Sequence, residues 1–292
     1  MIRFFLKILV VTLIGTFSTS AQSLLQYRLK IGDSITIIQK ATQNIVRQEQ
    51  GNAHKILNDL EENYTFKVSD KTDSTYTLAF HFNQFKLKTT SNKYGVMVDV
   101  DTAKPVKEDD TEGKIFGGLT NSELQIEMSN SGKIIQVQGA EKMISNMINL
   151  SGVQDEFTKQ LMIESMKSEF GNESLSHSFE QLTHIYPKQK VSIGDTWTNE
   201  YTGDIQSKNT WTLEKITDTV ILNANSTLSM SIEDEFSNLL LKGKQNIVVI
   251  ADKNTGFINE MTVNAEASNA SDIKESQNNP TKITSTTTYK IK

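Results

Sequence analysis

The sequence predicts an α+β fold, made mainly of long, twisted antiparallel strands in two related halves with a central helical segment packed on the sheet. Three observations support this. Apolar and polar residues alternate with a period of two along most of residues 22–292. The spacing changes to three or four between residues 140 and 186, as in helices. A short motif also occurs on both sides of that segment.

The strands before residue 140 are predicted from this alternation. Tyr76, Phe80 and Phe82 share one face of Thr75–Phe82, and the apolar positions then shift by one residue to Phe85. An uncompensated shift would turn the core face outward, so it indicates a bulge or bend near residues 83–84. The other strands predicted here are Ser34–Ile38, Tyr64–Val68, Lys93–Val100, Ser122–Met128 and Lys133–Gln138.

The strands after residue 186 follow the same pattern and are separated by turns. In the turn predicted at Asp252–Gly256, as in the one at Asn130–Lys133, Asp or Asn can bond the backbone and Gly can supply a positive φ. The strands predicted here are Asp195–Tyr201, Asn209–Lys215, Val220–Met230, Lys244–Ala251, Phe257–Ala267 and Lys282–Lys290.

The segment from 140 to 186 is predicted to be helical. Gly152 and Gly171 mark breaks in its pattern, and Pro187 follows its end. The three helices predicted here are Ala140–Leu150, Gln154–Phe170 and Glu173–Ile185. On both sides of it lies the repeated motif, Leu29–Ser34 in one half and Val191–Thr196 in the other. We therefore divide the chain into an N-terminal β half (22–139), the helical segment (140–186) and a C-terminal β half (187–292).

Residues 1–21 have the layout of a signal peptide. Arg3 and Lys7 precede an apolar run from Ile8 to Ile14, and small residues lead to a cleavage site after Ala21. The run is shorter than the roughly 20 residues that cross a bilayer, so no stable membrane anchor is expected. The sequence thus predicts an exported protein, periplasmic or secreted after cleavage near Ala21.

Charge and cysteine content exclude several classes of function. Without Arg3 and Lys7 the chain has 28 basic and 35 acidic residues, a net charge of −7, so we expect no nucleic-acid partner. The absence of cysteine rules out disulfides, thiolate catalysis, cysteine-ligated metal and an acylated N-terminal cysteine. Export without disulfides is typical of a bacterial envelope protein.

No catalytic signature is present. The sequence lacks the serine-hydrolase elbow, the His-Glu-x-x-His zinc motif, the phosphate loop and the dinucleotide fingerprint. We therefore predict no catalytic residue and no cofactor, and an enzyme is the weaker alternative.

The helical segment offers a candidate ligand-binding face. Methionine and aromatic side chains make it soft and apolar, which suits a pocket for a lipid or hydrophobic ligand. The alternative is that these side chains simply fill the core between helices and sheet. The six candidate residues are Met143, Met147, Phe157, Leu161, Met162 and Met166.

A candidate metal site is weaker. His177, Glu180 and His184 lie three and four residues apart, so a helix would place them on one face. The apolar residues of the same helix fall on the opposite side, so the three also fit an ordinary solvent-facing stripe.

The motifs Ser131–Gly139 and Pro187–Trp197, with the leader and the Gly-Asp-Ser at Gly32–Ser34, carry a resemblance. The chain resembles an uncharacterised family of exported proteins of similar length, found mainly in Bacteroidota and catalogued as a domain of unknown function. The resemblance implies architecture and compartment, with no established activity.

Three functional hypotheses follow. The first is a soluble, non-catalytic envelope protein that binds an apolar or amphipathic ligand between sheet and helices. The alternative is a protein-interaction or scaffold module with an envelope protein partner. The third is a metal-dependent hydrolase.

Overall fold

The computed structural model describes residues 22–49, 51–234, 237–269 and 280–292. The predicted signal peptide, residues 1–21, lies outside the described residues. Within the described part of the chain, no helix is long and apolar enough to cross a membrane.

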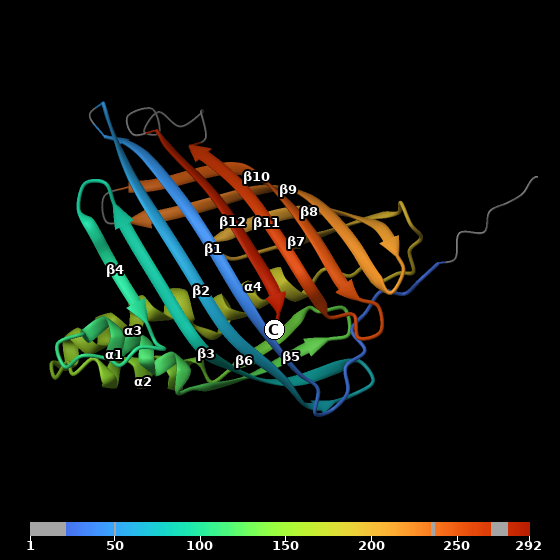
Figure 1. The fold of residues 1–292 in the computed structure, drawn as a ribbon, viewed down its shortest axis with the longest axis horizontal. Coiled ribbons are helices and arrows are strands. Elements are labelled where there is room, and N and C mark those ends of the chain that lie inside the picture. Colours follow the sequence, from blue (N-terminus) through green and yellow to red (C-terminus); the bar gives the residue numbers. More distant parts are fainter. Residues whose placement is uncertain (1–21, 50, 235–236, 270–279) are drawn as a thin grey trace, which may run out of the picture.

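The fold is one 12-stranded antiparallel sheet with a group of helices (Figure 1). The first strands and helix are β1 (Ser34–Glu49), β2 (Asn52–Lys71), β3 (Thr75–Ser91), β4 (Gly95–Asp101), α1 (Thr111–Thr120), β5 (Glu123–Ser129) and β6 (Ile134–Gln138). The helical segment follows as α2 (Ala140–Leu150), α3 (Glu156–Phe170) and α4 (Asn172–Thr183). The chain continues as β7 (Thr196–Tyr201), β8 (Ile205–Ile216), β9 (Thr219–Asp234), β10 (Ser237–Asp252), β11 (Ile258–Asn269) and β12 (Thr281–Ile291). The predicted fold class, mostly antiparallel β with a central helical segment, is confirmed.

The strand order shows how the chain builds a single sheet. The order is β6-β5-β3-β2-β1-β12-β11-β10-β9-β8-β7, and β4 pairs with β3 beside this path. Strands β1 to β6 therefore run outward to one edge, the helices cross over, and β7 to β12 return to the middle. There β12 pairs with β1 over eleven register positions, from Ile37–Ile291 to Arg47–Thr281.

Helix α4 and the residues after it connect the two edges of the sheet. At the β6 edge, the Thr183 hydroxyl donates to the carbonyl of Gly132 (2.6 Å). At the β7 edge, Trp197 Nε1 donates to the carbonyl of Ile185 (3.1 Å) and the Tyr201 hydroxyl to that of His184 (3.1 Å). The curved sheet thus has a concave face that α4 partly covers.

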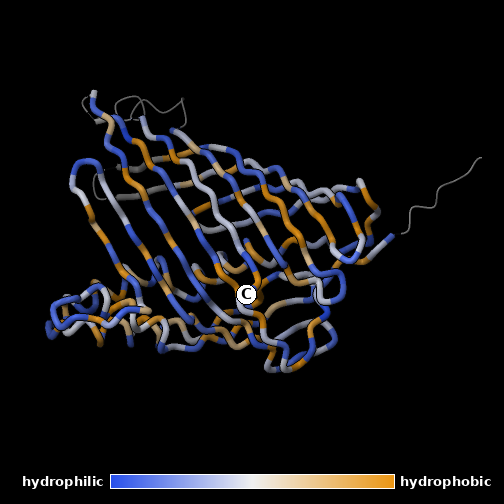
Figure 2. The backbone as a smooth tube through the Cα atoms, viewed as in Figure 1, coloured by the Kyte–Doolittle hydropathy of each residue, from blue (hydrophilic) through white to orange (hydrophobic). Residues whose placement is uncertain are grey.

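The main core lies on this concave face. Apolar and polar residues follow one another along the strands, as the hydropathy colours of the backbone in Figure 2 show. Phe66 and Phe80 from neighbouring strands pack at 5.1 Å between ring centroids, and Phe179 of α4 packs on Phe80 at 4.8 Å. Trp197 and Trp211 occupy paired positions on β7 and β8 and stack at 6.5 Å. Burial of these rings fixes α4 against the sheet.

The predicted bulge is confirmed. Asn63 of β2 pairs with Gln84 of β3, and the next residue, Tyr64, pairs with Phe82, so Asn83 is the extra residue. The Asn83 amide donates to Asn63 and Thr65 at 2.9 Å, which satisfies the side chain at this irregular position.

The repeated motif forms the same turn twice. Gly32 and Gly194 have φ of +91° and +89°. The carboxylate of Asp33 accepts from the backbone N–H three residues earlier at 2.8 Å, and the carboxylate of Asp195 does the same. Each turn leads into a strand. A relation between the two halves beyond these turns stays a prediction.

Two features differ from the expectations. Strands β1 and β2 are much longer than the predicted Ser34–Ile38 and Tyr64–Val68. Helix α1 lies between the predicted strands Lys93–Val100 and Ser122–Met128, where no helix was predicted. The Asp110 carboxylate caps this helix by accepting from Gly113 N at 2.7 Å.

Candidate ligand-binding cavity

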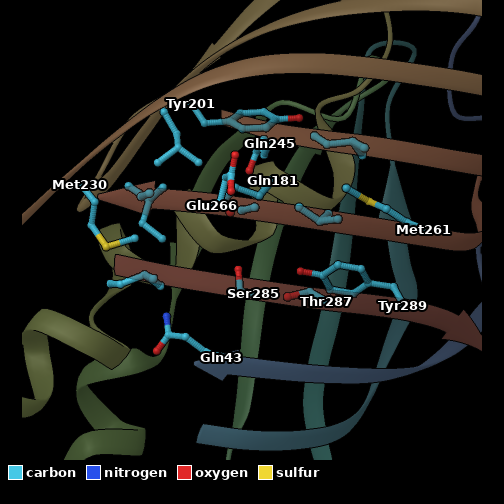
Figure 3. A pocket seen from close by; sticks show the side chains of 17 residues that line it. Gln43, Gln181, Tyr201, Met230, Gln245, Met261, Glu266, Ser285, Thr287 and Tyr289 are labelled. Atoms are coloured by element: carbon cyan, nitrogen blue, oxygen red, sulfur yellow. The ribbon is translucent and has the colours of Figure 1, made fainter. Parts of the chain in front are cut away.

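A cavity of ≈ 120 Å³ lies on the concave face of the sheet (Figure 3). It is lined by residues of seven strands, β1 and β7 to β12, and of helix α4. The lining residues are Gln43, Gln181, Tyr201, Ile205, Leu228, Met230, Gln245, Ile247, Met261, Val263, Ala265, Glu266, Ala267, Ile283, Ser285, Thr287 and Tyr289.

The cavity lies between two apolar clusters. Ile247 and Met261 belong to the main core. Leu228, Ala267 and Ile283 belong to a second, smaller cluster further along the same strands. We call this second group the distal cluster; its members are Leu228, Leu241, Ala267 and Ile283, with Ile45, Met230 and Ala265 packed against them. The core is therefore interrupted at the cavity rather than continuous along the concave face.

The cavity is long and narrow. On β12 its lining runs from Ile283 to Tyr289, which at about 3.3 Å per residue is about 20 Å. Its volume of ≈ 120 Å³ is well below the roughly 300 Å³ at which drug-sized pockets begin. A space of this shape fits one narrow apolar chain better than a fused ring system.

Polar side chains line one side of the cavity. Ser285, Thr287 and Tyr289 stand in a row along β12, since every second residue of a strand faces the same way (Figure 3). Gln43 accepts from the Asn58 amide at 2.9 Å, which leaves its own NH₂ group directed to the cavity region. The lining is therefore mixed, and an amphipathic ligand would find partners for both of its parts. Glu266 instead directs its carboxylate to Lys282 at 3.6 Å, where both side chains are exposed.

Glu62 lies on the concave face of β2, in the same series of alternating positions as Tyr64. Burial raises the pKa of the Glu62 carboxyl to about 7. The Tyr64 hydroxyl next to it donates to Gln39 Oε1 at 3.1 Å. Burial, and then the nearby Glu62, raise the pKa of Tyr289 as well. This part of the concave face therefore combines hydroxyl, amide and carboxyl groups in a poorly hydrated setting.

The structure places the three candidate metal ligands in different surroundings. His177 is half-buried beside Gly203, where an added Cβ would lie 2.7 Å from its Nδ1. Glu180 is buried against β6, where its Oε1 accepts from Ile134 N at 3.2 Å. His184 ends α4; burial, and then Lys133 and Lys188, lower its pKa to about 4, and its Nδ1 is buried without a hydrogen-bond partner in the described chain. No group of three or more His, Asp or Glu side chains among the described residues could hold a metal ion.

The stripe on α4 is thus not an ordinary solvent-facing one. Because α4 lies between the two sheet edges, the face that carries Glu180 packs on β6 while the opposite face packs on the core. Burial, opposed by the neighbouring Lys133, raises the pKa of Glu180.

The six candidate ligand-binding residues of the helices do not share one environment. Met143 and Met147 are fully buried in α2, and Met162 and Met166 of α3 pack against the main core. Phe157 and Leu161 of α3 are 72% and 57% exposed. None of the six lines the cavity on the concave face. Ligand binding at the helical face stays a prediction.

The cavity-lining residues of the strands were missed by sequence reasoning. The alternation along Lys282–Lys290 predicts a strand, but it does not indicate that one face of this strand lines a cavity. The residues on that face are Ile283, Ser285, Thr287 and Tyr289. The signal that could have pointed to them is the run of small and polar residues at core-facing positions, such as Ala265 and Gln245. Such residues leave space and need partners.

Fold and cavity together define a class of protein: a strongly curved antiparallel sheet with a narrow, partly open cavity on its concave face, beside a crossing helix. The chain belongs to the family of unknown function DUF6263, whose sequence profile matches residues 73–258. Both motifs that carry the resemblance, Ser131–Gly139 and Pro187–Trp197, lie inside this match. No curated protein matches the sequence.

Solved structures add a likeness of fold. The chain is similar to lipovitellin, in a structure described as lipid–protein interactions in lipovitellin, with a TM-score of 0.54 and 12% identity. The match covers 91% of this chain and 25% of lipovitellin, so the chain spans a quarter of that protein's length. An outer membrane channel from Pseudomonas putida F1 is matched with a TM-score of 0.28 and 7% identity, over 91% of this chain and 97% of the channel. The autotransporter NalP translocator domain from Neisseria meningitidis is matched with a TM-score of 0.23 and 7% identity, over 90% of this chain and 89% of that one.

Proposed function

We propose that this protein is a non-catalytic binding protein whose concave-face cavity takes an apolar or amphipathic ligand. The observation that carries the proposal is the interruption of the core at this cavity, between the main core and the distal cluster. The likeness of fold to lipovitellin, described together with its lipid interactions, supports a lipid or other hydrophobic ligand.

The chemistry of the lining fits binding without a reaction. Met230 and Met261 are flexible and polarisable, so they can adjust to chains of different width. Each methylene moved from water into the cavity contributes about 0.8 kcal/mol, so a chain that buries five of them gains roughly 4 kcal/mol.

The protein would act after export. The predicted leader and the absence of cysteine support a periplasmic or secreted location for residues 22–292. A hydrophobic ligand in that compartment needs protection from water, and an internal cavity provides it.

The proposal is tested by native mass spectrometry of the protein purified gently from its host envelope. We expect a retained ligand mass in the wild type. Ala265→Trp puts a large ring into the cavity and should abolish the retained mass. Ser268→Trp, on the exposed outer face of the same strand, is the matched control and should keep it. A wild type without ligand mass, or equal retention in both variants, contradicts the proposal.

The helical face is the alternative location for the same ligand. Phe157 and Leu161 expose large apolar groups on α3, and Met162 and Met166 lie beside them, half-buried. A ligand held there would survive Ala265→Trp and would be lost when Phe157→Ser and Leu161→Ser are combined.

A second candidate function, protein interaction, is favoured by strand β4. Among the described strands β4 pairs with β3 alone, and its Val96 and Met97 are 59% and 47% exposed. An open apolar edge of this kind can accept a strand from a partner protein. An envelope partner that co-purifies with the wild type, and is lost in Met97→Lys while the ligand mass is retained, would support this function.

A further inference from the structure

Arg47 lies on the concave face, next to the distal cluster. Arg47 follows Ile45 by two positions and Gln43 of the cavity lining by four, so all three side chains project from the same face of β1. Its neighbours in register are His54 on β2 and Thr281 on β12. At about 3.3 Å per residue, Arg47 stands about 13 Å along the strand from Gln43.

The Arg47 guanidinium lacks a protein counter-charge among the described residues. Its Nε is buried without a hydrogen-bond partner in that part of the chain, and no ion pair between described residues includes it. The side chain as a whole is half-buried. Buried polar atoms are almost always hydrogen-bonded, so a buried N–H donor without an acceptor is costly. A ligand that supplies the missing acceptor would remove this cost.

The described surroundings favour an acceptor with a single negative charge. The concave positions that are described on β11 and β12, from Met261 to Ala267 and from Thr281 to Tyr289, carry no charged side chain. The concave face of β2 has a carboxyl group at Glu62, but that residue pairs with Gln39, eight residues from Arg47 on β1, or about 26 Å. No second basic side chain occupies the described concave positions of β1 or β12, and the imidazole of His54, beside Arg47 in register on β2, is hydrogen-bonded to the Ser91 hydroxyl at 2.8 Å. One guanidinium matches a carboxylate in charge, whereas a doubly charged phosphate would call for a second cation.

We propose that Arg47 binds the headgroup of a single-chain amphiphile that ends in a carboxylate. The guanidinium offers two parallel N–H donors to the carboxylate oxygens, while the alkyl chain passes the distal cluster and enters the narrow cavity along its apolar side, at Ile283 and Val263. The proposal rests on the proposed binding function and names its ligand class.

The test compares ligands that differ only in the headgroup. Decanoate and 1-decanol each displace the fluorescent probe N-phenyl-1-naphthylamine from the full chain, in the wild type, in Arg47→Gln and in Lys40→Gln. Lys40 is the matched control: it lies on the outer face of the same strand, paired with Glu61 at 3.3 Å in solvent. Its substitution removes one positive charge without touching the concave face.

We expect the wild type to bind decanoate about tenfold or more tightly than 1-decanol, because a charge-assisted hydrogen bond is among the strongest of its kind. Arg47→Gln should lose this preference and keep its affinity for 1-decanol, while Lys40→Gln should behave as the wild type. Arg47→Lys keeps the charge and loses the planar fork, so its preference should be intermediate. This variant decides the matter if Arg47→Gln does not fold.

The possible failures are distinct. The role of Arg47 is overturned if the wild type binds decanoate and 1-decanol equally well. It is also overturned if Arg47→Gln, or both Arg47 variants, keep the preference for decanoate. In either case the binding function stands. If neither ligand displaces the probe from any variant, the binding function itself fails, and the headgroup proposal fails with it.

Discussion

Substitution of Gly132 by alanine should destabilise the fold by more than its backbone angle alone would cause. Gly132 has φ of +88°, a region that costs a residue with Cβ about 1–2 kcal/mol. A Cβ at this position would also overlap the carbonyl group of Thr183 at the end of α4 and lie 2.7 Å from Cε2 of Tyr27.

The overlap would push the end of α4 away from β6. Two hydrogen bonds meet there: the Tyr27 hydroxyl donates to Thr183 O at 2.9 Å, and the Thr183 hydroxyl donates to Gly132 O at 2.6 Å. Weakening both costs about 1 kcal/mol each. Together with the backbone term, Gly132→Ala should lower the free energy of unfolding by about 3–4 kcal/mol.

Gly194→Ala is the matched control. Gly194 has φ of +89°, and its added Cβ would meet open space, so only the backbone cost of about 1–2 kcal/mol applies. Urea unfolding followed by the fluorescence of the buried Trp197 and Trp211 measures both variants. An equal loss of stability in the two variants would refute the close approach of α4 to β6.

Two further predictions concern the repeated turn and the concave face. Asp33→Ala and Asp195→Ala each remove one 2.8 Å hydrogen bond between the carboxylate and a backbone N–H, in two equivalent turns. In urea unfolding, each variant should lose about 1 kcal/mol of stability and the double variant about 2 kcal/mol. A loss at only one of the two sites would contradict the equivalence of the turns. Glu62 has a pKa of about 7 in the fold against an ordinary value of 4.5, so the native state holds a proton that the unfolded chain releases, and stability falls as the pH rises from about 4.5 to 7. Glu62→Gln should therefore gain stability relative to the wild type between pH 5 and pH 8, by about 1–3 kcal/mol, and a pH-independent difference would contradict the burial of this carboxyl.

The sequence could predict strands wherever the concave face is filled by apolar side chains. Phe80 and Phe82 gave β3 its alternation, and the one-residue shift after them located the bulge at Asn83. Helices α2 and α4 were found for the same reason, since their apolar residues face one packed core, and α3 adds Met162, Met166 and Phe170 to its edge.

The extended parts of β1 and β2 could not be predicted in this way. Their concave positions carry Gln39, Gln43, Asn58 and Glu62, which remove the alternation of apolar and polar residues. Cross-strand hydrogen bonds satisfy some of these residues, such as Asn58 to Gln43 and Tyr64 to Gln39. Of these four residues, Gln43 also lines the cavity.

Helix α1 was missed for a different reason. Gly117 and Gly118 lower its intrinsic helix propensity, and the acidic run before it is typical of a loop. The structure shows why glycine is needed: a Cβ at Gly118 would lie 2.7 Å from the Cα of Met147, so α1 and α2 pack at backbone contact. Asp110 as the N-cap, followed by Ile115 and Leu119 at helical spacing, was the available signal.

Methyl NMR of methionine tests the central claim, that the ligand occupies the concave-face cavity. The protein is labelled at the methionine methyl groups and titrated with 1-decanol, an uncharged single-chain ligand. The account predicts that the signals of Met230 and Met261, which line the cavity, shift on titration while those of Met143 and Met147 in α2 stay in place. Shifts confined to the helical methionines, or no shift at any of them, would contradict it.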